Sequence, residues 1–341
     1  MTLANLQSLW YLVIAASVVF YAVLDGFDLG VGILHLFAKK DRDRRIFLNA
    51  IGPVWDGNEV WLVVTVGALF AGFPDVYATV MTAFYTMTML FLVGIIFRAV
   101  AIEFRSKQTS AQWRCCWDIS FCFASIIITF LLGVMLGNLI QGIPLNSDKE
   151  FIGGSLDLFS IYTVLIGIFS LSLFAMHGCI YLIMKTTHEL QAQLRRWLKP
   201  LIIFFFVTYL LATTMTFWKH PYMVDRIKEY PIALLFPLLT LFGIFSIPRY
   251  IAKHLEGRAF LISCLSIASL FILFGIGNYP LLLRSSIDPM TNSLTILDSS
   301  SAYTMRILLL IAFIGLPLVL AYGIYVYRIF KGKVEITDTS Y

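Results

Sequence analysis

Charged residues are scarce in this sequence, and their scarcity excludes a water-soluble protein. Lys, Arg, Asp and Glu make up 13% of the 341 residues, whereas an average soluble domain has about 25%. Apolar residues account for 59% of the chain and aromatic residues for 15%, and the mean hydropathy is +0.84. A chain with so little polar surface must turn an apolar exterior toward lipid. The sequence therefore predicts an integral membrane protein.

Signals for nucleic acid and for metal are lacking as well. The net charge is only +5, and no basic stripe is interleaved with exposed aromatic residues, so we predict no nucleic-acid partner. The five cysteines form no CxxC motif and no Cys/His cluster with the spacing of metal ligands. We therefore predict no metal site and look for chemistry among the polar residues within the membrane.

Nine apolar stretches are long enough to cross about 30 Å of hydrocarbon at about 1.5 Å per residue. They cover approximately residues 7–37, 53–73, 77–101, 117–140, 157–184, 200–218, 231–248, 259–279 and 305–329. The first lacks a basic n-region and is about twice as long as the apolar region of a signal peptide, so we expect it to remain as a span. No internal repeat or long polar insertion is visible. The sequence predicts one all-α membrane domain over residues 1–341.

The basic residues between the spans predict how the chain lies across the membrane. The segments after the odd-numbered spans, together with the C-terminal tail, hold 19 Lys and Arg residues, and the other side holds 6. Basic residues are enriched in the cytoplasmic segments of membrane proteins. We therefore expect the N-terminus outside and the C-terminus in the cytoplasm.

Two pairs of glycines predict where helices cross closely. Gly26 and Gly30 lie in the first predicted span, and Gly133 and Gly137 lie in the fourth. Each pair forms a small-xxx-small pattern, which lets the backbones of two membrane helices approach each other. We expect both spans to pack tightly against neighbours at these positions.

Two acidic clusters fall within the predicted spans, and an ionisable residue at that depth is expensive enough to suggest a function. The motifs are LDGFDLGVG (24–32) and GPVWDGNEVWL (52–62). Asp25 and Asp28 share one helix face, and Asp56 and Glu59 have the same spacing. In the predicted orientation all four lie in the inner half of the membrane or near its middle. Carboxylates arranged inward from the cytoplasm can carry protons, because a neutral acid is buried at little cost.

Structural roles are open alternatives for the same acids. Asp56 and Glu59 lie at the start of the second span, where a carboxylate can cap free amides and interact with the positive helix end. Asp25 and Asp28 lie deeper, where a carboxylate can pair with a basic residue such as Arg98. The sequence alone leaves proton relay, capping and ion pairing as competing interpretations.

Haem binding by this chain would require axial ligands, which are most often histidines. We predict that His177 lies within the membrane, and that His35, His188, His220 and His254 are solvated in loops or at span ends. A single buried histidine is more typical of a hydrogen-bonded helix contact than of a ligand. We therefore expect the chain by itself to bind no haem.

Eight motifs follow one another from the first predicted span to the C-terminal tail. In addition to the two acidic motifs, they are GALFAGFPDVYA (67–78), FRAVAIEFRSK (97–107), GNLIQGIP (137–144), HGCIYLIMKT (177–186), NYPLLLRSS (278–286) and FKGK (330–333). In this order they resemble subunit II of the cytochrome bd-type quinol oxidases. The sequence departs from some members at Val54, where they carry His, at Glu59, where they carry Gln, and in the short segment between spans 6 and 7.

The resemblance implies a fold, a partner and a reaction. The fold would be two four-helix bundles plus one extra helix. The partner would be a larger subunit I that carries haems b and d and the quinol-oxidising loop, with membrane lipids and small accessory subunits as further contacts. The complex would oxidise quinol near the outer face of the bacterial inner membrane and reduce oxygen to water with cytoplasmic protons.

The resemblance also implies roles for individual residues. Asp56 and Asp28 match the acids assigned to proton uptake, and Asp25 and Glu59 are candidate neighbours on that path. Family members also hold a structural quinone or lipid in this subunit. No catalytic or metal-binding residue is expected in this chain.

Two other functions remain as alternatives from the sequence. A free-standing proton-coupled transporter would also have acids and glycines within its spans, but transporters usually show repeats and interrupted spans in matching positions, and neither is visible. A purely structural subunit would only stabilise its haem-bearing partner. Removing the charge of an acid would separate that role from proton uptake.

Overall fold

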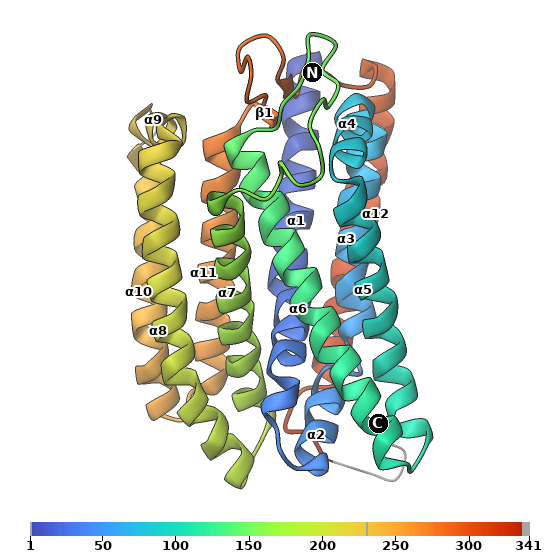
Figure 1. Cartoon of the computed structure of the whole chain (residues 1–341), viewed down its shortest axis with the longest axis vertical. Helices are drawn as coiled ribbons and strands as arrows, with labels where there is room; N and C mark the ends of the chain where they lie inside the picture. Colours follow the sequence, from blue (N-terminus) through green and yellow to red (C-terminus); the bar gives the residue numbers. More distant parts are fainter. Residues whose placement is uncertain (1, 230, 336–341) are drawn as a thin grey trace.

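The computed structural model describes residues 2–229 and 231–335, most of which form long helices that lie side by side (Figure 1). The segments that correspond to the predicted spans are α1 (Leu3–Leu34), α3 (Trp55–Gly72), α4 (Pro74–Ala83) with α5 (Tyr85–Phe104), α6 (Ala111–Gln141), α7 (Ile161–Lys185), α8 (His188–Lys219), α10 (Leu235–Ala252), α11 (Glu256–Asn278) and α12 (Ala302–Ile329). The connecting elements are α2 (Asp41–Ile51), α9 (Pro221–Glu229), the 3-10 helices η1 (His35–Phe37), η2 (Arg105–Lys107) and η3 (Pro231–Leu234), and the strands β1 (Leu281–Leu283) and β2 (Leu294–Thr295).

The helices confirm a multi-pass membrane fold. Within the described part of the chain, eight helical segments are long and apolar enough to cross a membrane. The remaining predicted span, 53–73, forms α3, which begins with the polar sequence WDGNE and is not among these eight. The prediction of nine helices is thus approximately correct, and α3 carries two of the candidate acids, Asp56 and Glu59.

Two predicted spans differ from the helices that form. The stretch 77–101 is interrupted at Phe84, where the backbone leaves the helical conformation (φ −94°, ψ 18°). The predicted span 200–218 belongs to a helix that begins twelve residues earlier. Its early turns are polar, but Leu190, Leu194 and Leu198 recur every fourth residue and are buried. One apolar stripe is enough to hold an amphipathic helix on the protein, and a hydropathy search does not detect it.

The packing between elements divides the long helices, which lie side by side in Figure 1, into two groups of four and one extra helix. The first group contains α1, α3, α5 and α6, and the second contains α7, α8, α10 and α11; α1 and α6 both pack on α7 and join the groups. The extra helix, α12, lies against α1 and α3. This arrangement confirms the predicted two bundles plus one helix, and it places α1 between the bundles.

Close crossings of α1 and α7 occur at glycines, as predicted. A Cβ atom on Gly30 would lie 1.9 Å from the carbonyl oxygen of Phe174, and one on Gly178 would lie 2.4 Å from the carbonyl carbon of Gly30. In α6, a Cβ atom on Gly137 would lie 2.9 Å from the backbone of Thr163. Only glycine leaves room for backbones this close, so these residues fix how deeply the polar face of α1 is buried.

Candidate functional site

The acidic residue Asp25 is locked into a buried ion pair. Arg98, in the last third of α5, donates two hydrogen bonds to Asp25, from Nη1 to Oδ2 at 3.0 Å and from Nη2 to Oδ1 at 2.5 Å. Both side chains are fully buried. This fork-to-carboxylate geometry is the strong form of the pair. The structure therefore contains the Asp25–Arg98 ion pair that the sequence offered as one alternative. It places Arg98 inside the protein, not in the basic loop to which the orientation count assigned it.

Asp28, one turn further along α1, is held by an amide instead of a cation. Asn58 of α3 donates from Nδ2 to Oδ2 of Asp28 at 2.7 Å. The hydroxyl of Tyr327, near the end of α12, donates to Oδ1 of the same asparagine at 2.8 Å. Asn58 therefore links the fully buried Asp28 of α1 to Tyr327 of α12.

Carboxylates outnumber cations around these residues. Glu59 lies with its Oε2 atom 3.9 Å from Nη1 of Arg98, and its side chain is 17% exposed. Together with Asp25 and Asp28, it gives the network three acids for one guanidinium among the described residues. Burial of an unpaired charge is costly, so a proton or an opposite charge must compensate the excess. This imbalance is the main chemical feature of the site.

Several polar atoms of the network are also buried without a hydrogen-bond partner. Within residues 2–229 and 231–335, they include the hydroxyl of Tyr21, Oδ1 of Asp28, Oε2 of Glu59 and Nε of Arg98. Buried polar groups in proteins are almost always paired with protein or with ordered water, and a water needs two to four such partners. The arrangement therefore suits internal water next to the acids.

Asp56 lies on the surface of this chain, in the first turn of α3. The N-cap of that helix is Val54, whose side chain makes no capping hydrogen bond. Among the described contacts, the carboxylate of Asp56 makes no capping hydrogen bond either. Exposure falls in steps from Asp56 to Glu59 and then to Asp28. The four predicted residues are thus brought to one region, with Asp56 on the surface and with Asp25 and Asp28 buried.

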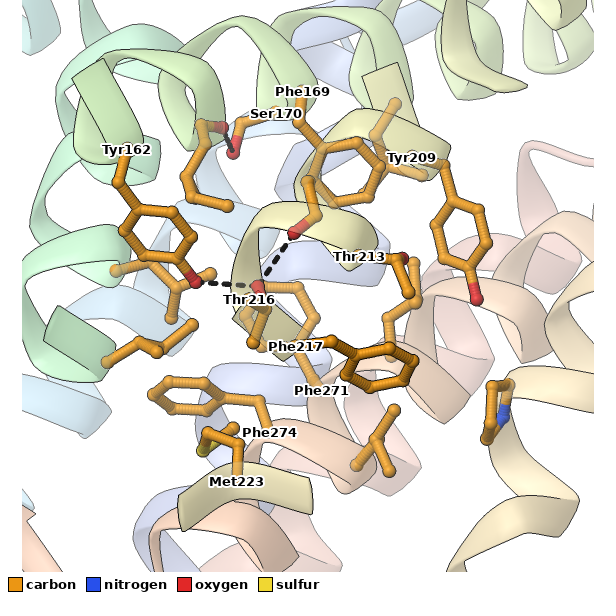
Figure 2. Close-up of a pocket in the computed structure, with 18 of the residues that line it drawn as sticks. Tyr162, Phe169, Ser170, Tyr209, Thr213, Thr216, Phe217, Met223, Phe271 and Phe274 are labelled. Carbon is orange, nitrogen blue, oxygen red and sulfur yellow. Dashed lines mark hydrogen bonds between the residues drawn. The ribbon is translucent and has the colours of Figure 1, made fainter. Parts of the chain in front are cut away.

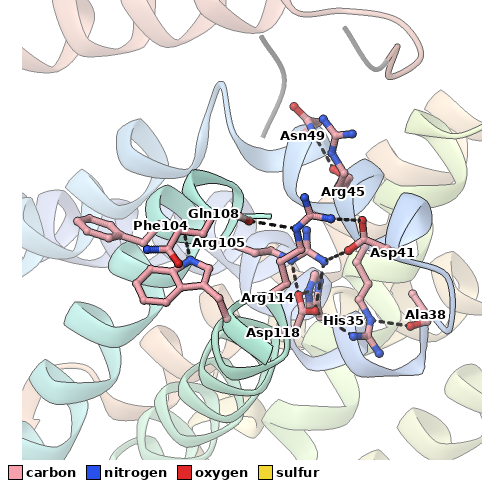
Figure 3. A network of polar contacts seen from close by, with 12 residues as sticks. His35, Ala38, Asp41, Arg45, Asn49, Phe104, Arg105, Gln108, Arg114 and Asp118 are labelled. Carbon is pink, nitrogen blue, oxygen red and sulfur yellow. Dashed lines mark hydrogen bonds and ion pairs between the residues drawn. The ribbon is translucent and has the colours of Figure 1, made fainter. Parts of the chain in front are cut away.

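A third buried carboxylate, Asp118, lies near the beginning of α6, and hydrogen-bond partners occupy both of its oxygens (Figure 3). Its Oδ1 atom lies 2.6 Å from Nε2 of His35 and accepts a hydrogen bond from Nε of Arg105 at 2.5 Å. Its Oδ2 atom accepts from Nη1 of Arg44 at 2.9 Å and from Arg105 at 3.2 Å. These bonds tie η1, α2, η2 and α6 together at the end of the molecule opposite the N-terminus.

The prediction that His35 is solvated is wrong. Its ring is completely buried between Asp118 and Phe121, and the ring centroids of the histidine and the phenylalanine are 5.1 Å apart. The sequence places this histidine next to Lys39 and Lys40, which suggests an exposed boundary, but η1 turns the side chain toward α6. The two residues are more than 80 positions apart in the chain, so the sequence around His35 does not indicate this contact.

His177 makes the hydrogen-bonded helix contact that is the ordinary interpretation of a buried histidine. Nδ1 lies 2.7 Å from the hydroxyl of Ser263, and Nε2 lies 3.0 Å from the carbonyl oxygen of Val23. The ring also stacks on Phe260 at a centroid distance of 5.1 Å. Both ring nitrogens are occupied, so this donor set does not fit an axial haem ligand.

An apolar cavity of about 200 Å³ lies between α6, α7, α8, α10 and α11 (Figure 2). Apolar and aromatic side chains, including Phe169, Phe271 and Phe274, form most of its wall. Hydroxyl groups supply the few polar contacts, and the hydroxyls of Tyr162 and Thr216 lie 2.9 Å apart at one side. Such a lining accepts a hydrocarbon chain better than a polar molecule.

Sequence reasoning missed three residues of these networks. Asn58 lies inside the motif GPVWDGNEVWL, between Asp56 and Glu59. An amide carries no charge, so the search for ionisable residues within the spans did not select it. Asp118 falls within the predicted span 117–140, and the rule that intramembrane acids matter could have found it. Tyr327 has no such signal, because tyrosine near the end of a membrane helix is typical of the interface.

Comparison with known proteins gives matches over almost the whole chain. The family described as Cytochrome bd terminal oxidase subunit II matches residues 6–330. The "Cytochrome bd-I ubiquinol oxidase subunit 2" of Escherichia coli (strain K12) is 31% identical, over 98% of this chain and 96% of that protein. The "Cytochrome bd ubiquinol oxidase subunit 2" of Bacillus subtilis (strain 168) is 30% identical, over 98% of both chains.

The fold is also similar to that of a solved structure. A chain from the structure of bd oxidase from Geobacillus thermodenitrificans superimposes with a TM-score of 0.78 over 96% of this chain and 98% of the other, at 18% sequence identity. The apolar helices and the bacterial relatives indicate a multi-pass protein of the bacterial inner membrane. The chain belongs to the cytochrome bd terminal oxidase subunit II family.

Proposed function

We propose that this subunit of a cytochrome bd-type quinol oxidase contributes to the uptake of cytoplasmic protons for the reduction of oxygen to water. The observation that carries the proposal is the excess of buried carboxylates over cations, with open oxygen atoms on Asp28 and Glu59 and with Asp56 at the surface. A network of fixed ion pairs cannot exchange protons, whereas carboxyl groups with open oxygens can.

The residues have different tasks on this path. Asp56 collects a proton from water because it is exposed, and Glu59 and Asp28 carry it inward as neutral acids, with water between them. Asp25 is a positioning residue, because both of its oxygens are bonded to Arg98. The guanidinium remains charged and stabilises whichever of the neighbouring carboxylates is ionised.

The other components of the oxidase follow from family membership. We assign haems b and d, which supply the electron-transfer and oxygen chemistry, and the quinol site to subunit I, the heterodimeric partner. His177, with both ring nitrogens hydrogen-bonded, supports that assignment. The family match does not support the free-standing transporter, and mutation of the acids distinguishes proton uptake from a purely structural role.

We propose the orientation from the charge of the loops. The end of the molecule that holds α2, η2 and the C-terminal end of α12 carries the basic segments (Figure 1), and it is cytoplasmic by the positive-inside rule. Because Arg98 lies inside α5, it no longer counts among the basic residues of the cytoplasmic loops. That side still has a large excess of Lys and Arg. A reporter fused to the C-terminus is expected to be cytoplasmic; an external signal would reverse the assignment.

We also propose that the apolar cavity holds the hydrocarbon chain of a structural quinone or lipid. Its lining and its volume of about 200 Å³ suit an isoprenoid or acyl segment. Ala212 lines the cavity and is buried, so Ala212→Phe should fill it and reduce the quinone or phospholipid extracted per purified complex. Ala252→Phe, at an exposed helix end, is the control. If the two variants yield equal amounts of quinone and of phospholipid per complex, the proposed binding of a quinone or lipid in this cavity is refuted.

The central test of proton uptake uses Asp56→Asn in membranes that contain the complete oxidase. The amide keeps the size of the side chain but cannot take up and release a proton. We expect normal haem content, slow oxygen consumption per haem and impaired charge movement, with partial recovery in Asp56→Glu. Asp28→Asn should slow turnover similarly.

The matched control is Asp75→Asn. This residue is also an exposed acid in the first turn of a helix, but it lies in α4 at the opposite end of the molecule. It should assemble and turn over normally. If Asp56→Asn and Asp28→Asn both consume oxygen at the wild-type rate with full haem content, proton uptake is refuted and a purely structural role is the remaining interpretation.

A further inference from the structure

The helix α12 lies almost entirely on the outside of the protein, but one of its side chains reaches inward to the network around Asp28. Of its residues, only Met305 is buried. Near its other end, the hydroxyl of Tyr327 reaches inward to Asn58. Three bonds hold the segment after this end against α7. Nζ of Lys185 donates to the carbonyl of Phe330 at 2.6 Å, the Val334 amide donates to the Lys185 carbonyl at 2.8 Å, and Nζ of Lys333 donates to the Ile183 carbonyl at 3.4 Å.

The contacts of Asn58 determine which way its amide points. Nδ2 lies 3.4 Å from the carbonyl oxygen of Leu24, which can only accept, and 2.7 Å from Oδ2 of Asp28. Oδ1 therefore faces α12 and accepts from Tyr327. A flipped amide would place its oxygen against the Leu24 carbonyl, which cannot donate, and against the ionised Asp28 carboxylate, and both bonds would be lost.

This orientation makes the two oxygens of Asp28 unequal. Oδ2 accepts the Asn58 bond, whereas Oδ1 is buried with no hydrogen-bond partner in the described ranges. Both forms of the carboxyl group are compatible with the bond to Oδ2, because an ionised and a neutral carboxyl oxygen can each accept it. A proton can therefore be gained or lost at Oδ1 without rearrangement of the surrounding helices.

We propose that Tyr327 and Asn58 are positioning residues that reserve Oδ2 of Asp28 as a permanent acceptor and leave Oδ1 as the oxygen that takes up and releases the proton. A proton bound at Oδ1 gives a neutral acid, and its transfer to water restores the carboxylate. The inference rests on the proposed role of Asp28 in proton uptake. It adds the atom that exchanges the proton and the residues, on two other helices, that select it.

The test compares Tyr327→Phe with Tyr325→Phe in the complete oxidase in membranes. Tyr325 is on the same helix but is exposed, so its variant controls for loss of a hydroxyl from α12. Infrared difference spectra during turnover would identify the carboxyl band of Asp28 as the band that Asp28→Asn removes. We expect Tyr327→Phe to shift that band and to lower oxygen consumption per haem about threefold, as for loss of one net hydrogen bond. Tyr325→Phe should change neither.

The outcomes separate this inference from the proposed function. If Asp28→Asn is slow but Tyr327→Phe keeps the wild-type band and rate, the positioning role is refuted and the relay remains. If Asp28→Asn has the wild-type rate, the relay through Asp28 fails, and the positioning role falls with it. Asn58→Leu provides a second variant that should shift the same band, and an unshifted band in that variant also refutes the inference.

Discussion

The molecule contains two buried networks of acids and arginines, and they differ in how their charges balance. Around Asp118, two arginines and a histidine occupy both carboxylate oxygens. Around Asp28, acids exceed cations, and one oxygen has no partner among the described residues. Burial alone therefore does not distinguish a structural acid from a proton carrier. The number of open oxygens and the sign of the excess charge do.

The two networks also occupy different positions. The Asp118 network joins short connecting elements at the end of the bundle, where it can hold α2 against α1 and α6 (Figure 3). The Asp28 network lies between long helices, where apolar side chains exclude bulk water. A carboxylate whose two oxygens are both bonded to cationic side chains holds elements in place. A carboxylate with a free oxygen in an apolar setting can exchange protons through a few internal waters.

The largest effect is expected for Asp118→Asn. The change leaves the buried guanidinium group of Arg105, and the partly exposed one of Arg44, short of a counter-charge. Loss of one partner of a buried ion pair typically destabilises a protein by about 3–5 kcal/mol. We expect little assembled oxidase, measured as haem per membrane protein, and a lower thermal unfolding midpoint. Normal assembly with slow turnover would instead make this network part of the proton path and would remove the distinction between the two networks.

A smaller loss of assembly is expected for Asp25→Asn. Arg98 loses its paired carboxylate, but Glu59 already lies 3.9 Å from Nη1, and the surplus of acids can supply the missing charge. The expected destabilisation is about 1–3 kcal/mol, typical of one lost hydrogen bond to a charged group. Thermal unfolding of the purified complex would measure it. Destabilisation equal to that of Asp118→Asn would show that the surplus acids do not compensate.

Glu59→Gln tests whether the half-buried acid assists transfer. We expect full assembly and an oxygen consumption rate per haem lowered about threefold, since the side chain is partly exposed and water can replace it. The family resemblance supports a moderate effect, because some members carry Gln at this position. Oxygen consumption over a range of pH is the measurement. A complete loss of turnover would make Glu59 an obligatory step and not a supporting one.

The smallest effect is expected for Asp41→Asn at the edge of the Asp118 network. Asp41 accepts from Arg105 at 2.7 Å and from Arg114 at 3.1 Å, but its side chain is 48% exposed. Exposed pairs contribute about 0–1 kcal/mol, so assembly and turnover should stay near wild type. This variant is the matched control for Asp118→Asn, and a similar loss in both would assign the stabilising role to the whole network.

The sequence by itself determined the membrane fold, the approximate spans and the motifs that hold the four acids. Long apolar segments with few charges are stable in lipid as helices, because each helix forms the hydrogen bonds of its backbone N–H and C=O groups internally. The glycines at which α1 and α7 cross were visible in part, because Gly30 belongs to a small-xxx-small pattern. These properties depend on neighbours in the chain, and local patterns report them.

Only the tertiary structure decided which acid is paired and which is open. Asp25 and Asp28 look alike in the motif LDGFDLGVG, but one faces Arg98 of α5 and the other faces Asn58 of α3. Tyr327 reaches Asn58 across 269 positions of the chain. Protonation depends on distances, burial and counter-charges supplied by distant helices, and these exist only after the helices have packed together.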